Sequence, residues 1–217
     1  MIMENIEIVL QLFRDCAEFD DCYDFVSPAI YKLRNEGWHC ASGVTRVAVW
    51  HDTWDYVLKI DRNYDEQFYC SLEAYNYSLA KEHGVERVLL PIERVAIVNG
   101  WKIYRQVKYD CGWDDRKSRQ SQKLRRECQK VKVGKAFDKI SRNLDRRLAN
   151  AWIARATQLY GKHFMRSLEN WVAQAKVCDL HSNNIGFYKK KPVLIDYAGY
   201  FGSNGSLPVD KKFLEKF

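Results

Sequence analysis

The chain has 217 residues, 47% hydrophobic and 14% aromatic, and can therefore fold around a sizeable core. With 4 Pro and 11 Gly it is neither collagen-like nor a low-complexity linker. Its apolar runs fall far short of the ~20 residues that cross a bilayer, and no secretory signal is visible, so we expect a cytoplasmic protein with no membrane partner. The 7 cysteines occur singly, which disfavours a disulfide framework.

The formal net charge of +7 is concentrated in one segment. Residues 116–147 contain 13 Lys and Arg against three acids, which gives this basic segment +10 and leaves −3 for the remainder of the chain. Positive segments attract acidic protein surfaces, nucleic acid or phosphate-bearing ligands, although a solvated helix face without a partner is the simpler explanation. Because Phe137 is the segment's only aromatic residue, stacking on single-stranded nucleic acid is less favoured than an acidic protein surface.

The first 37 residues have the pattern of helices. Apolar residues over 4–18 recur at helical spacing, which predicts a first helix. Ser27 and Pro28 suit the start of a second helix, and Gly37 suits its end. We therefore expect residues 1–37 to form an N-terminal helical extension.

Residues 38–107 have the pattern of an antiparallel sheet with one helix. Three short segments rich in β-branched and aromatic residues predict a meander: 38–40, 45–50 and 56–60. Residues 64–82 follow with one apolar helical face. Two further strands are predicted over 87–98 and 101–107, joined by an Asn99-Gly100 turn. The predicted order is β-β-β-α-β-β, a five-stranded sheet.

Residues 108–217 are predicted to be mainly helical. Two helices are expected over 144–160 and 162–176, followed by a small hairpin of strands 185–188 and 193–195. The residues after Gly199 have little periodicity.

Polar residues in apolar surroundings mark the candidate chemistry. Lys59 lies in a predicted strand, where the plain explanation is a lysine that protects a sheet edge. Asn184 precedes the predicted hairpin and Asp196 follows it, so the two ends are brought together, with Asp179 slightly upstream. Converging oxygen atoms suit Mg²⁺, whereas the simpler alternative is that these residues cap turns.

The order of these parts is that of the protein kinase fold. A strand lysine, a helix glutamate, two more strands, Asp179-x-x-x-x-Asn184 and Asp196-Tyr197-Ala198-Gly199 follow one another. Residues 38–202 thus resemble a small protein kinase, and are most similar to the serine/threonine kinases encoded by some bacteriophages, in which Asp-x-His-Ser-x-Asn-Ile replaces the usual catalytic loop. The resemblance implies an α+β, minimal bilobal kinase-like fold: an N-lobe over 38–107 and a truncated helical C-lobe over 108–217.

The resemblance assigns nucleotide-binding roles to the sheet region. Lys59 matches the lysine that holds the α- and β-phosphates of ATP. Glu73 matches its ion-pair partner; Glu66 is the rival, but its place near the helix start is explained by the helix dipole. Ser42 and Gly43 are the remnant of a glycine-rich loop, whose backbone N–H groups approach phosphates.

The resemblance assigns the transfer step to the hairpin region. Asp179 matches the base that accepts the substrate hydroxyl proton, and Asn184 and Asp196 match the Mg²⁺ ligands. His181 stands where many protein kinases have Lys, so it is expected to contact the γ-phosphate.

The departures from the family bear on the substrate. Val177-Cys178 replaces the usual His-Arg, and after Gly199 we do not expect the peptide-binding helices of larger kinases. We therefore expect the basic segment 116–147 to dock an acidic host protein, whose Ser or Thr hydroxyls are phosphorylated with ATP and Mg²⁺ in the host cytoplasm. The alternatives are an aminoglycoside-type small-molecule kinase, a non-catalytic kinase-fold binding protein and, less favoured, nucleotidyl transfer.

Overall fold

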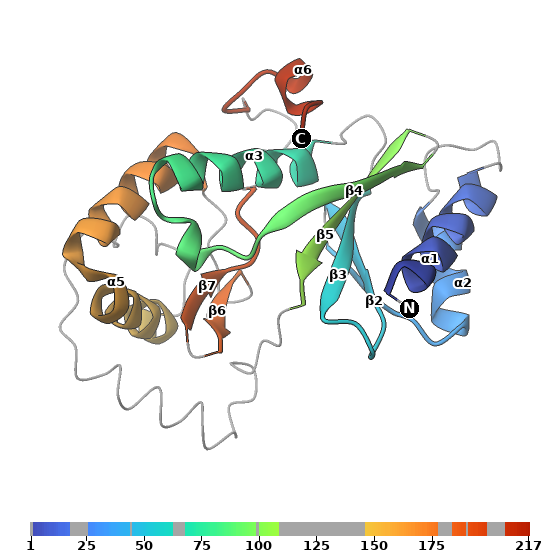
Figure 1. The fold of residues 1–217 in the computed structure, drawn as a ribbon, viewed down its shortest axis with the longest axis horizontal. Coiled ribbons are helices and arrows are strands. Elements are labelled where there is room, and N and C mark those ends of the chain that lie inside the picture. Colours follow the sequence, from blue (N-terminus) through green and yellow to red (C-terminus); the bar gives the residue numbers. More distant parts are fainter. Residues whose placement is uncertain are drawn as a thin grey trace. The chain divides into compact units, whose positions relative to one another are not determined.

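The structure is a computed structural model with α+β architecture (Figure 1). It describes residues 2–17, 26–43, 45–62, 68–98, 100–108, 146–177, 184–189, 191–198 and 207–217. The chain divides into two compact units. The first comprises Met1–Ala74, Ile92–Lys108 and Leu214–Phe217; the second comprises Tyr75–Pro91 and Tyr109–Phe213. Among the described residues, no helix combines the length and the apolar composition that a membrane span requires.

The first unit is built on a five-stranded antiparallel sheet, as predicted. Its strands are β1 (His39–Ser42), β2 (Arg46–Trp50), β3 (Tyr56–Asp61), β4 (Ile92–Val98) and β5 (Trp101–Val107). Their order in the sheet is β1-β2-β3-β5-β4, which places β3 in the centre. The predicted strand over 87–98 begins too early: Glu86–Val88 form a 3₁₀ helix, and β4 starts after Pro91, which has no N–H to donate to a sheet.

One face of the sheet is apolar and shares its core with two helices. The helices are α1 (Ile2–Ala17) and α2 (Val26–Asn35), which lie side by side next to the sheet (Figure 1). The core unites buried residues of all these elements, among them Val9, Phe13, Ala29, Leu33, Val47, Val49, Leu58, Ile60 and Ile103. The N-terminal helices are therefore part of the packing of the first unit.

The opposite face of the sheet carries buried polar side chains. Cross-strand partners in a sheet point to the same face, and the register pairs Arg46 with Asp61 and Lys59 with Tyr104. Gln106 follows two residues after Tyr104, on the same face. These residues are all buried. Because charged and polar groups are not buried without partners, this face needs a polar neighbour, which α3 supplies.

The start of helix α3 (Tyr69–Glu82) is hydrogen-bonded to the end of strand β3. The carboxylate of Asp61, the last residue of β3, accepts the backbone N–H of Cys70 at 3.1 and 3.3 Å. This N–H lies in the first helical turn, where it has no partner within the helix. One residue further, Ser71 Oγ lies 2.6 Å from Tyr104 Oη across the polar face. The N-terminal half of α3 is thus tied to the sheet by side-chain hydrogen bonds.

The second unit contains the long helix α5 (Arg146–Gln174) and a small hairpin. Gly161, with φ 82° and ψ 171°, breaks α5 into the two predicted helices, since this conformation is one that glycine adopts readily. The hairpin consists of β6 (Ile185–Tyr188) and β7 (Lys191–Leu194). Strand β7 begins two residues earlier than predicted and includes Pro192, which a two-stranded sheet tolerates because both strands are edges. A short helix α6 (Lys211–Leu214) was not predicted.

Candidate functional site

Lys59 lies in the central strand of the sheet, not at an edge. Strand β3 is paired with β2 on one side and β5 on the other. The residue is 8% exposed. A lysine that protects a sheet edge has no use here, so this explanation of Lys59 is wrong. A buried ammonium group in a central strand requires a buried counter-charge.

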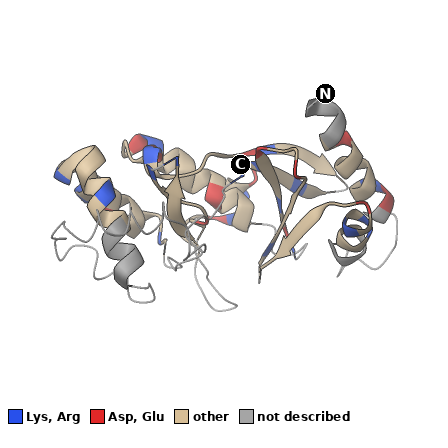
Figure 2. Cartoon of the chain, turned by 90° about the horizontal axis from the view of Figure 1, so that it is seen from below, with Lys and Arg blue, Asp and Glu red and all other residues tan. Residues whose placement is uncertain are grey.

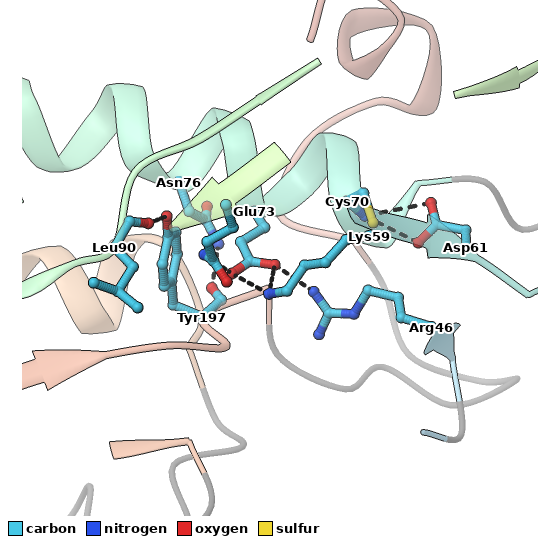
Figure 3. A network of polar contacts seen from close by, with 9 residues as sticks. Arg46, Lys59, Asp61, Cys70, Glu73, Asn76, Leu90 and Tyr197 are labelled. Atoms are coloured by element: carbon cyan, nitrogen blue, oxygen red, sulfur yellow. Dashed lines mark hydrogen bonds and ion pairs between the residues drawn. The ribbon is translucent and has the colours of Figure 1, made fainter. Parts of the chain in front are cut away.

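Glu73, on α3, supplies this counter-charge (Figure 3). The ammonium Nζ of Lys59 donates to both carboxylate oxygens of Glu73, at 3.0 Å from Oε1 and 2.9 Å from Oε2. The side chain of Glu73 is completely buried. The predicted pairing of Lys59 with Glu73 is therefore present, and the two residues come together across fourteen positions of sequence. The rival, Glu66, lies outside the described residues.

Two further donors on Glu73 were missed by sequence reasoning. Arg46 Nη1, from β2, donates to Glu73 Oε2 at 2.5 Å, and Gln106 Nε2, from β5, donates to Oε1 at 3.1 Å. We call Arg46, Lys59, Glu73 and Gln106 the Glu73 cluster. The signal that could have found them is the alternation of side chains along a strand. Once the register of β2, β3 and β5 is known, this alternation places Arg46 and Gln106 on the same face of the sheet as Lys59. Sequence alone did not give that register.

Asp61 lies on the same face, and the pKa of its carboxyl group is raised. Burial raises the pKa of its carboxyl from 3.8 to about 6, while the charge of Arg46 and the hydrogen bonds from Cys70 oppose the rise. Glu73 adds a smaller upward effect on this pKa. The guanidinium of Arg46 thus influences two buried carboxyl groups, one that caps α3 and one within it.

The turn between β1 and β2 is short. Gly43 N–H donates to the carbonyl of Arg46 at 2.8 Å, which closes a tight turn directly after Ser42. Arg62 Nη1 donates to the carbonyl of Gly43 at 3.2 Å. Ser42 and Gly43 are exposed. The N–H of Gly43 is thus already bonded within the turn, and the role of both residues in phosphate binding stays a prediction.

In the second unit, the hairpin brings the flanks of its two strands together as predicted. Ile185 pairs with Leu194, and Ile195 N–H donates to the carbonyl of Asn184 at 2.9 Å. Asn184 is buried at 7% exposure, and Asp196, which follows Ile195 directly, is half-buried. The backbone of Asn184 is therefore bonded to the residue next to Asp196. An amide and a carboxylate oxygen suit Mg²⁺, which commonly takes one or two carboxylates together with substrate phosphates.

The segment after Asp196 is anchored by buried hydrogen bonds (Figure 3). Asn76 Nδ2 donates to the carbonyl of Tyr197 at 2.8 Å, and Tyr197 Oη donates to the carbonyl of Leu90 at 2.6 Å. Trp171 Nε1 donates to the carbonyl of Asn76 at 3.0 Å. Tyr197 is completely buried. These contacts fix the backbone next to Asp196, and the sequence did not predict them.

Several predicted site residues lie outside the described part of the chain. They are Asp179 and His181, and residues 109–145, which hold most of the basic segment. On the described helices and strands, Figure 2 shows Lys and Arg as well as Asp and Glu. Within the described ranges, no group of three or more His, Cys, Asp or Glu residues is placed to hold a metal ion. A metal at Asn184 and Asp196 would thus need further ligands, such as substrate phosphates.

Comparison of the sequence with protein-family models and with curated proteins finds no match.

Proposed function

We propose that this chain is an ATP- and Mg²⁺-dependent kinase that phosphorylates Ser and Thr hydroxyls of proteins, similar to the small bacteriophage kinases. In this proposal, residues 38–107 form the nucleotide-binding lobe and residues 108–217 a truncated helical lobe. The observation that carries the proposal is the buried Lys59–Glu73 ion pair, at 2.9 and 3.0 Å. An ion pair between a central strand and the following helix is the arrangement that protein kinases use to present a lysine to the phosphates of ATP.

Each proposed residue has a distinct task. Lys59 binds the α- and β-phosphates, and Glu73 orients its ammonium group. Asp179 accepts the proton of the attacking hydroxyl, and His181 contacts the γ-phosphate. Asn184 and Asp196 would hold Mg²⁺, which when bound neutralises phosphate charge. The basic segment 116–147 recruits an acidic host protein by electrostatic attraction.

The proposal is tested with ATP labelled at the γ- or the α-phosphate. The purified protein is incubated with each nucleotide, with and without Mg²⁺, in a bacterial lysate. We expect protein-bound label from the γ-position only, dependent on Mg²⁺ and recovered as phosphoserine or phosphothreonine. Label from the α-position would instead indicate nucleotidyl transfer, and ATP consumption without labelled protein would indicate a small-molecule kinase.

The Asp179→Asn variant is the matched control for chemistry. It keeps the shape of the side chain and removes its ability to accept a proton. Loss of a general base costs roughly 10²- to 10⁴-fold in rate, so labelling should fall by this factor while ATP affinity is retained. A large loss of ATP affinity with normal turnover at saturation would contradict the role of Asp179.

One observation favours a second candidate, a non-catalytic binding protein. The N–H of Gly43 is bonded to Arg46 within a tight turn, so this turn offers less backbone to phosphates than a full glycine-rich loop. A binding protein of this kind would retain ATP or partner binding without any transfer of label.

A further inference from the structure

We propose that Arg46 and Gln106 are positioning residues that hold Glu73 in place when Lys59 turns its ammonium group to the phosphates of ATP. This inference rests on the proposed function, because it assumes that Lys59 binds a nucleotide. It assigns a task to two side chains for which the kinase resemblance gives none.

The first step of the argument is the pattern of donors on Glu73. Oε1 accepts from Lys59 at 3.0 Å and from Gln106 at 3.1 Å. Oε2 accepts from Lys59 at 2.9 Å and from Arg46 at 2.5 Å. Each carboxylate oxygen thus has one donor from Lys59 and a second donor from another strand. If Lys59 withdraws, both oxygens remain hydrogen-bonded.

The second step is the burial of Glu73. Its side chain has no exposed surface, so water cannot replace a donor that leaves. An ionised carboxylate without partners is strongly disfavoured in such a place. If Lys59 were the only cation at Glu73, moving its ammonium group to phosphate would leave a buried carboxylate without a cation, and this cost would weaken phosphate binding. The second set of donors removes this cost, because Arg46 keeps the carboxylate paired with a cation.

The third step is the origin of the donors. Arg46 lies on β2 and Gln106 on β5, the two strands that flank the β3 strand of Lys59. Helix α3 is therefore tied to the sheet through Glu73 from both sides of Lys59. The position of Glu73 is set by the neighbouring strands, independently of what the ammonium group of Lys59 contacts.

The test is a double-mutant cycle of Arg46→Ala and Lys59→Ala, read out as the affinity for Mg·ATP. Arg46→Ala should weaken binding by about 10- to 100-fold, the range expected for the loss of a charge-assisted hydrogen bond. In the Lys59→Ala background, Arg46→Ala should cost less than about 2-fold, because a residue that acts through Lys59 has no effect once Lys59 is gone. Arg46→Lys, which keeps a cation at Glu73, should restore most of the affinity.

The matched control is Arg105→Ala, on β5. Arg105 is exposed and paired with the exposed Glu93, so its removal deletes an arginine of the same sheet without touching the Glu73 cluster. Affinity for Mg·ATP should be unchanged in this variant. If Arg46→Ala does not fold, Arg46→Gln takes its place in the cycle, since it removes the charge and keeps a hydrogen-bond donor.

The outcomes separate this inference from the proposed function. Unchanged affinity in Arg46→Ala overturns the positioning role alone. An equal loss with and without Lys59 also overturns it, because Arg46 would then contact phosphate directly. If the unaltered chain binds no Mg·ATP, the proposed function fails and this inference fails with it.

Discussion

The two regions proposed to carry the chemistry are held in place in different ways. In the first unit, the Glu73 cluster is held by its own side chains, which donate hydrogen bonds from three strands to one buried carboxylate. In the second unit, Asn184 and Asp196 are held by backbone pairing of a hairpin and by Asn76 and Tyr197, which lie outside the proposed metal site.

This difference predicts how each region responds to mutation. In the Glu73 cluster the functional groups and the stabilising groups are the same, so a substitution there alters the charge balance of the buried face as well as the proposed chemistry. At the hairpin the two tasks are separate, so the proposed metal ligand can be changed while its supports remain. Substitutions in the Glu73 cluster should therefore lower both activity and the free energy of unfolding. In the second unit, a substitution of the proposed metal ligand should lower activity alone.

The largest effect is expected for Glu73→Ala. This change removes the buried carboxylate to which both Lys59 and Arg46 donate hydrogen bonds. Breaking a buried ion pair by removing one partner costs about 3–5 kcal/mol, and we expect a loss of this size in the free energy of unfolding, measured with urea. Lys59→Ala should cost less, because Arg46 and Gln106 still hydrogen-bond Glu73.

The control for Glu73→Ala is Glu93→Ala. It removes the acid of an exposed ion pair with Arg105 in the same sheet, which costs at most about 1 kcal/mol. Equal stability of the two variants would contradict the structural role of the Glu73 cluster.

The next effect concerns the second unit and falls on activity. Asp196→Asn removes a negative charge from the proposed metal site and keeps the shape of the residue. Loss of one electrostatic contact to the reacting groups typically costs about 10²- to 10³-fold in rate, whereas the free energy of unfolding should change by less than about 1 kcal/mol. The rate of γ-phosphate transfer measures the first effect, and urea unfolding of the same samples measures the change in the free energy of unfolding.

Asp210→Asn is the matched control for Asp196→Asn. Asp210 is an exposed acid of the second unit whose carboxylate accepts the N–H of Lys212, a contact that Asn can also make. Transfer should be unaffected. If Asp196→Asn transfers phosphate as fast as Asp210→Asn, Asp196 is not a ligand of the proposed metal site.

The parts of the fold that depend on local pattern could be predicted from the sequence. Short segments rich in β-branched and aromatic residues, together with the Asn99-Gly100 turn signal, are sufficient to predict the five strands, and Gly161 separates the two parts of α5. The pairing of Lys59 with Glu73 was also predicted, but through the resemblance to kinases and not through spacing.

The other members of the site depend on contacts that local pattern does not contain. Arg46 and Gln106 reach Glu73 only because β2 and β5 both flank β3, which is a property of strand order. The hydrogen bond from Asn76 to Tyr197 joins residues 121 positions apart. Such contacts arise from tertiary packing, so a single sequence gives no signal for them.

A third prediction uses pH to sharpen the view of the first unit. The pKa of Asp61 is raised from 3.8 to about 6, so between these values the folded state holds a proton that the unfolded state has lost. This contribution to stability is complete below pH 4 and is lost as pH rises through 6. The raised pKa corresponds to about 3 kcal/mol. Asp61→Asn cannot lose a proton and still offers an oxygen to Cys70 N–H.

Urea unfolding of wild type and Asp61→Asn at pH 4 and pH 7 tests this prediction. The variant should gain stability relative to wild type as pH rises, by an amount of order 3 kcal/mol or less. The difference between the two proteins isolates Asp61 from the other titrating groups. The same dependence on pH in both proteins would show that Asp61 has an ordinary acidity.

The smallest effect is expected for Tyr197→Phe, next to Asp196. The change removes the hydrogen bond of 2.6 Å to the carbonyl of Leu90 but keeps the ring, whose centroid lies 6.2 Å from that of Trp171. A hydrogen bond of this kind contributes about 1 kcal/mol, which is the expected loss in unfolding free energy. Transfer should fall much less than in Asp196→Asn, because Asn76 still holds the carbonyl of Tyr197.

Tyr188→Phe, in the hairpin that precedes Tyr197, is the control for Tyr197→Phe. Its ring lies 5.0 Å below the ammonium of Lys189, a contact that Phe retains, so stability should change by less than about 0.5 kcal/mol. Comparing these variants with Asp196→Asn distinguishes the structural role of Tyr197 from the proposed metal-binding role of Asp196. If Tyr197→Phe lost as much transfer as Asp196→Asn with unchanged stability, the hydroxyl would act in the chemistry itself, and support and function would not be separate in the second unit.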